Sequence, residues 1–529
     1  MTRLSWVVLC LVAAGVVGGA SAVASAAPPM TSAIQQCPVD TPALDRYTYL
    51  RALSLDLRGS VPNVAELKAL NSTADVPDNI IDGWLASKAF ADQAVRRHRD
   101  LLWNNIVNVR APLAPTYLRK TGQLYWRGGG NTSIYVRGDR VPCLDVPATW
   151  DGDGQIIYKQ QADGTKREGW VMVSPYWAPT TKIKVCAHDA QATLVSPTGK
   201  TCGETGTFYD PFCGCGPNLR WCHYGSSNVV VMQSFAQSLD RAISELILND
   251  APYTHLFTAK TLWVNGPMVF FYQHQLHQIR LRMTPAPFDV AKLPKLAYSD
   301  VDKWVEIPLG PQHAGVLTHP AFLLRFQTNF SRANRFYNTF LCQPFQAPAT
   351  GIDVSAVTAT NQPDLQQRPG CKYCHALLGP VSSFWGRWTE SGAGFLNKID
   401  FPPTHPDCET CAKTGQLCTA DCKNYYLTKA SADAEKPYLG MLQAYVFRQD
   451  VHKHYVEQGP RLMALGAVAD NRLPRCVALR TAEWLVGREL EGEELDWAQG
   501  LALDFVKNGY RFRSLVRDIV TSDLYRRVR

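Results

Sequence analysis

Apolar side chains recur every three or four positions in three long stretches of the chain, which is the pattern of amphipathic helices. The first stretch is residues 40–110, where a Gly-Ser-Val-Pro break at 59–62 separates two expected helices. The second is residues 228–300, where the regular steps stop at Pro252. The third is residues 435–529. Examples of the periodic positions are Leu53, Leu57, Val64, Leu67, Ile81, Trp84, Met232, Phe235, Leu239, Ile243, Phe512, Leu515, Val516 and Ile519.

Residues 111–227 have a different character. Gly, Pro, Trp and Thr are dense there, the apolar runs are short, and six cysteines occur. This composition predicts a Cys-rich insertion of loops and short strands. Residues 310–425 carry further cysteines among many Pro and Gly residues. We therefore expect a mainly α, multi-domain protein with helical parts at 40–110, 228–300 and 435–529, the insertion at 111–227, and a separate Cys-containing region at 310–425.

Residues 1–26 are typical of a secretory signal peptide. Arg3 supplies the positive charge, an apolar stretch runs from Leu4 to about Val17, and Ala24-Ser25-Ala26 is a cleavage pattern. An uncleaved membrane anchor is the alternative. No later stretch of about 18 apolar residues occurs, so we expect no membrane span after cleavage. A periplasmic or extracellular protein with a formal net charge of only +8 is a poor partner for nucleic acid.

The sequence Cys371-Lys372-Tyr373-Cys374-His375 carries the clearest chemistry. C-x-x-C-H is the attachment pattern of c-type haem. Two thiols three positions apart on a tight turn reach the two vinyl groups of one porphyrin, and the adjacent imidazole becomes the proximal iron ligand. The alternatives are a Cys371–Cys374 disulfide beside an unused histidine, or half of a zinc site.

Several segments resemble a known family in the same order along the chain. They are 51–59 (R-A-L-S-L-D-L-R-G), 80–103 (beginning I-I-D-G-W-L-A-S), 313–323 (H-A-G-V-L-T-H-P-A-F-L), 475–488 and 508–522. Together they are similar to the secreted planctomycete-type cytochrome c domain proteins, bacterial proteins of poorly defined role. The resemblance implies one haem c bound at Cys371, Cys374 and His375, and together with the motif it predicts a cytochrome c-like haem region at 310–425. It covers most of 45–105 and 310–525, but this chain has Leu378-Gly379-Pro380 where the family usually has Asp-Pro.

The sequence offers several candidates for the second, distal ligand of the iron. Met441 and His319 are the first candidates, and Met463 and His405 are further ones. A methionine would raise the reduction potential, a histidine would lower it, and an open position would allow chemistry on small molecules.

Two other cysteine groups could bind metal. Cys408, Cys411, Cys418 and Cys422 could hold zinc or an iron–sulfur cluster, and Cys213, Cys215 and Cys222 with His223 could hold zinc or a second haem. Disulfides are the favoured alternative for both groups, because oxidation competes with metal binding outside the cytoplasm. Asp151-Gly-Asp-Gly154 resembles a calcium loop only faintly, and a plain turn is the simpler interpretation.

These patterns predict an exported c-type cytochrome-like protein that passes electrons, through one covalent haem c, to or from a redox partner protein that the sequence does not name. One alternative is an enzyme, a haem-dependent oxidoreductase or peroxidase with an open distal site. The other is a secreted, disulfide-stabilised binding module without haem. No G-x-S-x-G, H-E-x-x-H or Walker A pattern points to a different chemistry.

Overall fold

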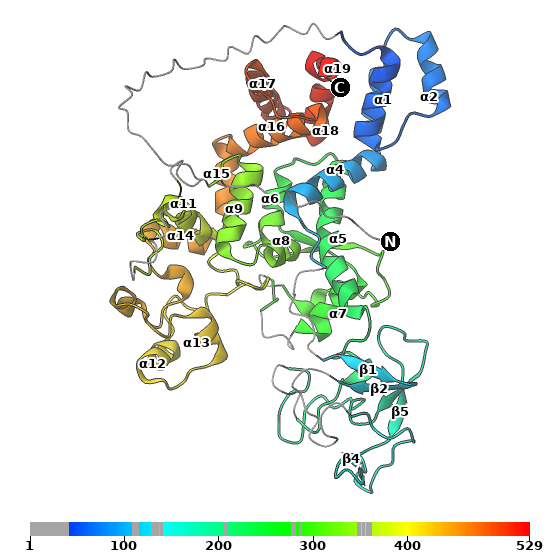
Figure 1. Cartoon of the computed structure of the whole chain (residues 1–529), viewed down its shortest axis with the longest axis vertical. Coiled ribbons are helices and arrows are strands. Elements are labelled where there is room, and N and C mark those ends of the chain that lie inside the picture. Colours follow the sequence, from blue (N-terminus) through cyan, green and yellow to red (C-terminus); the bar gives the residue numbers. More distant parts are fainter. Residues whose placement is uncertain are drawn as a thin grey trace, which may run out of the picture. The chain divides into compact units, whose positions relative to one another are not determined.

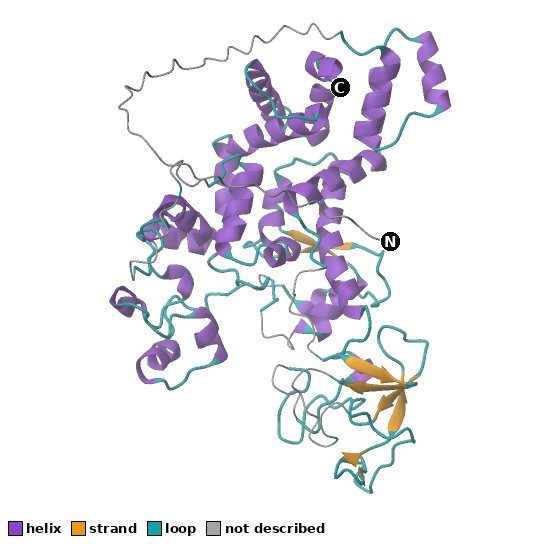
Figure 2. Cartoon of the chain, in the orientation of Figure 1, coloured by secondary structure: helices purple, strands orange, loops and turns teal. Residues whose placement is uncertain are grey.

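The computed structural model describes residues 42–107, 116–128, 137, 141–204, 207, 210–276, 282–285, 288–345, 351, 355 and 362–528. Helices make up most of the regular structure (Figure 2), which confirms the expectation of a mainly α protein. The expected signal peptide at 1–26 lies outside the described residues. Within the described part of the chain, no helix is both long enough and apolar enough to cross a membrane.

Four α-helices form between residues 46 and 102, and their capping residues explain where they begin. The Asp45 side chain accepts hydrogen bonds from two amides in the first turn of α1, and Asn63 and Glu66 form a capping box on α2. Gly59 ends α1 with φ 70°, a left-handed conformation that suits glycine. The elements are α1 (Arg46–Arg58), α2 (Val64–Ala69), η1 (Leu70–Ser72), α3 (Asp78–Leu85) and α4 (Lys88–Leu102), in blue in Figure 1.

The expected insertion consists of loops and short strands. Its four-stranded sheet has the order β1-β2-β6-β5, in which β2 and β6 are parallel and the other neighbours are antiparallel. The apolar side chains form three small clusters of their own. The elements are β1 (Leu118–Thr121), β2 (Leu124–Arg127), β3 (Lys159–Gln160), β4 (Lys166–Arg167), β5 (Trp170–Val173), β6 (Ile183–Cys186) and η3 (Pro217–Leu219).

A buried charge network replaces a large apolar core in this β region. Arg137 is fully buried and donates to Glu168 at 3.0 Å and to Asp189 at 2.7 Å. Arg127 also donates to Asp189, at 3.0 Å. Burial acts to raise the pKa of Asp189, but the two guanidinium groups outweigh it and lower that pKa to about 2. The carboxylate therefore stays charged and paired inside the protein.

The other helices share one large hydrophobic core. Leu50 of α1, Phe235 of α5, Phe322 of α8 and Phe505 of α17 are all buried in it. Between residues 227 and 340 the elements are α5 (Ser227–Leu248), α6 (His255–Thr258), β7 (Thr261–Val264), α7 (Gly266–His274), η5 (Val290–Lys292), β8 (Val305–Pro308), η6 (Gly315–Thr318), α8 (Pro320–Arg325) and α9 (Asn329–Phe340).

Residues 396–456 form a second, smaller core around the Cys408–Cys422 disulfide. The elements after residue 370 are α11 (Lys372–Ser382), η7 (Ser383–Trp385), α12 (Pro406–Thr414), α13 (Ala420–Tyr425), η8 (Asp433–Tyr438), η9 (Gln443–Tyr445), α14 (Asp450–Gln458), α15 (Pro460–Ala469), α16 (Arg472–Val486), α17 (Glu493–Lys507), α18 (Phe512–Val520) and α19 (Asp523–Val528). Helical segments far apart in sequence therefore belong to one folded body, and the 396–456 region adds a small core beside them.

The disulfide Cys342–Cys476 joins the end of α9 to α16 across 134 residues, whereas Cys408–Cys422 spans only 14. Replacing each pair by alanines should lower the free energy of unfolding, and the loss should be larger for the longer loop by about 2 kcal/mol, because that loop restricts the unfolded chain more. Denaturant titration of the two double variants measures the difference. Equal losses, or a larger loss for Cys408→Ala/Cys422→Ala, would contradict this account of the long disulfide.

Candidate functional site

Cys371 and Cys374 differ from the other described cysteines in their bonding. Six disulfides join twelve of the described cysteines, and neither residue of the C-x-x-C pair belongs to any of them. Both side chains are half-buried. The disulfides fit a protein that folds in an oxidising compartment.

The other candidate metal clusters use their ligand atoms for different bonds. Their sulfurs form Cys408–Cys422, Cys411–Cys418, Cys202–Cys213 and Cys215–Cys222. The disulfide alternative therefore holds for both cysteine groups, and no thiolate remains in them for zinc. The faint calcium loop is a turn: one Asp151 carboxylate oxygen accepts hydrogen bonds from the amides of Asp153 and Gln155, at 3.1 and 2.7 Å.

The three motif residues lie at the N-terminal end of α11. Gly370, with φ 77°, turns the chain just before the helix. The Cys371 carbonyl then accepts a hydrogen bond from the His375 amide at 3.0 Å. Helical residues three and four positions apart lie on the same face, so both sulfurs and the imidazole share one face of the helix.

The two ends of α11 differ in burial. At the C-terminal end, the chain enters the main core through Trp385, which is fully buried and donates its Nε1 hydrogen to the Leu317 carbonyl at 2.8 Å. At the N-terminal end, Tyr373 and Leu377 are 54% and 52% exposed. The helix is therefore fixed at one end and presents the cysteines, with exposed apolar neighbours, at the other.

His375 lies beside a cavity of about 270 Å³. Its ring packs edge-on against Phe330 of α9, with 4.7 Å between the ring centroids. Its Nδ1 is buried without a hydrogen-bond partner among the described residues. Burial, followed by the charge of Arg448, lowers the pKa of this imidazole, so the ring is neutral near pH 7 and able to ligate a metal.

Arg448 brings a positive charge to the same cavity. It donates to the Ser382 hydroxyl, at the end of α11, over 3.3 Å. Burial lowers the pKa of this guanidinium, and its Nε has no partner among the described residues. Arg448 and Phe330 are functional candidates that the sequence did not indicate. They lie far from the motif along the chain, and only the packing of α9, α11 and the segment before α14 brings them to His375.

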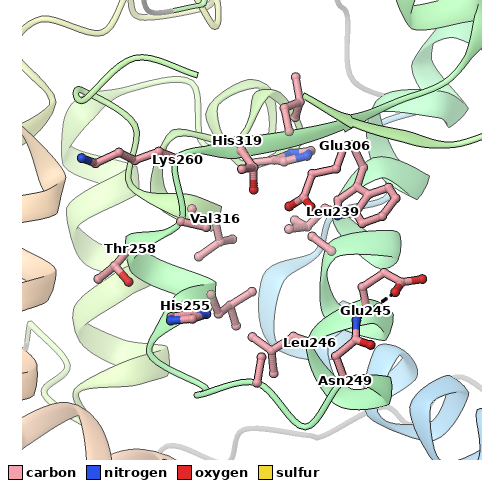
Figure 3. Close-up of a pocket in the computed structure, with 18 of the residues that line it drawn as sticks. Leu239, Glu245, Leu246, Asn249, His255, Thr258, Lys260, Glu306, Val316 and His319 are labelled. Carbon is pink, nitrogen blue, oxygen red and sulfur yellow. Dashed lines mark hydrogen bonds between the residues drawn. The ribbon is translucent and has the colours of Figure 1, made fainter. Parts of the chain in front are cut away.

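His319 lines a different cavity, shown in Figure 3. Its Nδ1 accepts a hydrogen bond from the Ala321 amide at 3.1 Å and caps α8. Nδ1 is therefore unprotonated, and the neutral ring donates from Nε2 to the Ser238 hydroxyl at 3.0 Å. Both ring nitrogens are thus occupied by the protein, and the structure does not bring this predicted iron ligand to the cavity beside His375.

The other predicted distal ligands also lie elsewhere. Met441 packs against the small core around Cys408–Cys422, and Met463 is buried in the main core. His405 caps α12 with its side chain. Among the described residues that line the cavity beside His375, there is no methionine and no second histidine.

No protein family matches this chain, and no curated protein or solved structure matches it. The resemblance to the planctomycete-type cytochrome c domain proteins therefore rests on the sequence segments alone.

The buried His319 should make folding sensitive to acid. Burial, with a smaller effect of His313, lowers its pKa from the ordinary 6.5 to about 3. Between these values the unfolded chain binds a proton that the folded protein does not, so this residue destabilises the fold by about 1.4 kcal/mol per pH unit as the pH falls. His319→Asn keeps a capping side chain. It should lower the pH dependence of the free energy of unfolding by the amount that one bound proton contributes.

Urea unfolding at several pH values from 7 to 4 measures the slope. The exposed His454 of α14 offers a control, because His454→Asn replaces a histidine at the surface without altering the buried site. If His319→Asn has the same pH dependence of unfolding as the wild type, the fold does not hold the His319 imidazole neutral.

Proposed function

We propose that this chain is an exported c-type cytochrome-like protein that transfers electrons through one covalently attached haem c. The observation that carries the proposal is the shared face of α11, where Cys371, Cys374 and His375 lie together and His375 lines a cavity. The position of both cysteines outside the six disulfides supports it. So do the disulfides themselves, because haem c attachment and disulfide formation both occur outside the cytoplasm.

Three features of this face fit a haem. The imidazole of His375 packs against Phe330, and its buried Nδ1 has no hydrogen-bond partner in the part of the chain that the structure describes. Leu377, three positions after Cys374, is an exposed apolar side chain that an attached porphyrin would cover. Arg448 offers a positive charge that matches the propionate groups. The cavity of 270 Å³ is slightly below the common range of about 300–1,000 Å³, so it would enclose only part of the ring.

A bound haem supplies one-electron chemistry at its iron. The residues of the chain would do the rest: the two cysteines hold the ring, and His375 ligates the iron. The charge of Arg448 would favour the reduced form of a bound haem over its oxidised form and would so raise the reduction potential. We place this protein in the periplasm or outside the cell.

A second candidate function is that of a haem-dependent oxidoreductase with an open distal position. The observation that favours it is the lining of the cavity. Among the described residues that line it, His375 is the only histidine, and there is no methionine. An open position lets a small molecule reach the iron, as in peroxidases. Gln366 and Arg448, which line the same cavity, are polar groups able to orient such a molecule.

Removing both sulfurs should abolish covalent haem. We expect Cys371→Ala/Cys374→Ala, purified from a periplasm with active cytochrome c maturation, to show no haem stain on a denaturing gel and no pyridine haemochrome spectrum, because no thioether can form. Cys411→Ala/Cys418→Ala is the matched control, since it also removes two nearby cysteines, and it should keep the haem. A folded wild-type protein without covalent haem would contradict the proposal. The secreted, disulfide-stabilised binding module would then be the remaining interpretation.

The state of the distal position is tested by carbon monoxide. We expect the reduced wild-type protein to bind it, with a shift of the Soret band, because the described residues that line the cavity beside His375 include no methionine and no second histidine. Arg448→Leu should still bind carbon monoxide but should have a lower reduction potential, because a positive charge is lost. A reduced spectrum that carbon monoxide leaves unchanged would exclude the open site and the enzyme with it.

A further inference from the structure

A cavity of about 390 Å³ lies in the Cys-rich insertion. Its volume is within the range of about 300–1,000 Å³ that is usual for small-molecule sites. The disulfides Cys143–Cys186 and Cys202–Cys213 adjoin its walls, so the site is held in shape before a ligand arrives. The cavity is lined by residues of the hairpin 149–157, of β5 (labelled in Figure 1) and of the segment 187–197, together with Phe212.

The lining of this cavity is uncharged. Among the described residues that form it there is no Asp, Glu, Lys, Arg or His. The other two cavities differ in this respect, because Arg448 lines the one beside His375 and both Lys260 and Glu306 line the one that contains His319. A charged ligand would lose water in the uncharged cavity without gaining an opposite charge. The lining therefore favours a neutral ligand.

Three polar side chains of the lining offer hydrogen bonds: Gln155, Gln191 and Thr193. The Nε2 of Gln191 donates to the carbonyls of His188 and Pro211, at 3.0 and 3.1 Å, which fixes the orientation of this amide. Its Oε1 accepts no hydrogen bond from a described residue, and the exposed Gln155 amide has no partner in the described part of the chain. A wholly apolar ligand would cover these groups without satisfying them. The ligand should therefore carry hydrogen-bonding groups.

The indole of Trp150 adds a flat apolar surface to the same cavity. This side chain is 49% exposed. Three other tryptophans of the insertion, Trp126, Trp170 and Trp221, each have a cationic side chain over the ring, at 5.8, 4.5 and 5.2 Å from the centroid. No described residue stacks on Trp150 or places a cation over it. The negative face of an uncovered indole attracts the weakly positive hydrogens of C–H groups.

We propose that this cavity binds a neutral carbohydrate. A pyranose ring is uncharged, carries hydroxyl groups that donate and accept around its rim, and presents C–H groups on its faces. One face of the sugar would stack on Trp150, and its hydroxyl groups would bond to Gln155, Thr193 and the Oε1 of Gln191. This inference does not depend on haem, because this cavity and the one beside His375 share no lining residue.

A glycan array probed with the full chain tests the class of ligand. We expect binding to neutral oligosaccharides and signals about tenfold weaker for their sulfated and uronic acid counterparts, because the cavity offers no opposite charge. Calorimetry with the best neutral oligosaccharide, and with glucose, galactose, mannose and xylose, then separates a glycan from a free sugar as the ligand. Absence of binding to every neutral sugar, or stronger binding to the charged glycans, would overturn the proposal. Tighter binding of adenosine, a neutral ligand with a flat base, would overturn it as well.

Variants of the lining test the site itself. Trp150→Ala should weaken the binding of the best neutral sugar about tenfold, because the stacking surface is lost, whereas Trp150→Phe should keep part of the affinity. Gln155→Leu should also weaken it about tenfold, because this exposed amide bonds only to the ligand. Trp103→Ala is the matched control: Trp103, at the end of α4, is 51% exposed and lies outside the cavity, so this variant should bind like the wild type. Wild-type affinity in both Trp150→Ala and Gln155→Leu would refute the site.

Discussion

The buried guanidinium of Arg332 is the interaction on which the candidate haem site depends. It is fully buried in α9 and donates to five backbone carbonyl oxygens over 2.8 to 3.4 Å. Two of these carbonyls end α8, and three belong to residues 388–392, which follow α11 and η7. Burial lowers the pKa of this group to about 9, yet it remains charged at neutral pH. A buried cation is tolerated only when its hydrogens are satisfied, so these three segments are held together.

This arrangement fixes both walls of the site. Phe330 stands two positions before Arg332 on α9 and contacts the ring of His375. Trp385 anchors the end of α11 in the core. It precedes in sequence the carbonyls of Trp388, Thr389 and Gly392, to which Arg332 donates. The N-terminal end of α11 is left with exposed apolar side chains and two cysteines outside the disulfides. A helix fixed at one end, with apolar side chains exposed at the other, would suit the haem attachment that we propose.

Much of the helical part could be predicted from the sequence because burial follows a period of 3.6 residues in α3, α5 and α18, where Trp84, Phe235 and Leu515 are buried as expected. The insertion was recognisable because its composition lacks that period. The partners of each face could not be predicted, since periodicity reports which side of a helix is buried but not what covers it. Arg332 illustrates the limit: in a helix with three Asn and two Arg, a guanidinium is expected to face solvent, and only the carbonyls around it explain its burial. The functional candidates Arg448 and Phe330 could not be predicted either, because periodicity does not show which residues pack around His375.

The central claim is that the sulfurs of the C-x-x-C-H motif bond to a haem while the other described cysteines bond to one another. Mass spectrometry of the exported wild-type protein, digested without reduction after alkylation, tests it most directly. The account predicts a peptide that contains Cys371 and Cys374 with the added mass of one haem, together with the six disulfide-linked peptide pairs. A peptide in which Cys371 and Cys374 are joined by a disulfide, or are alkylated and carry no haem, would contradict it.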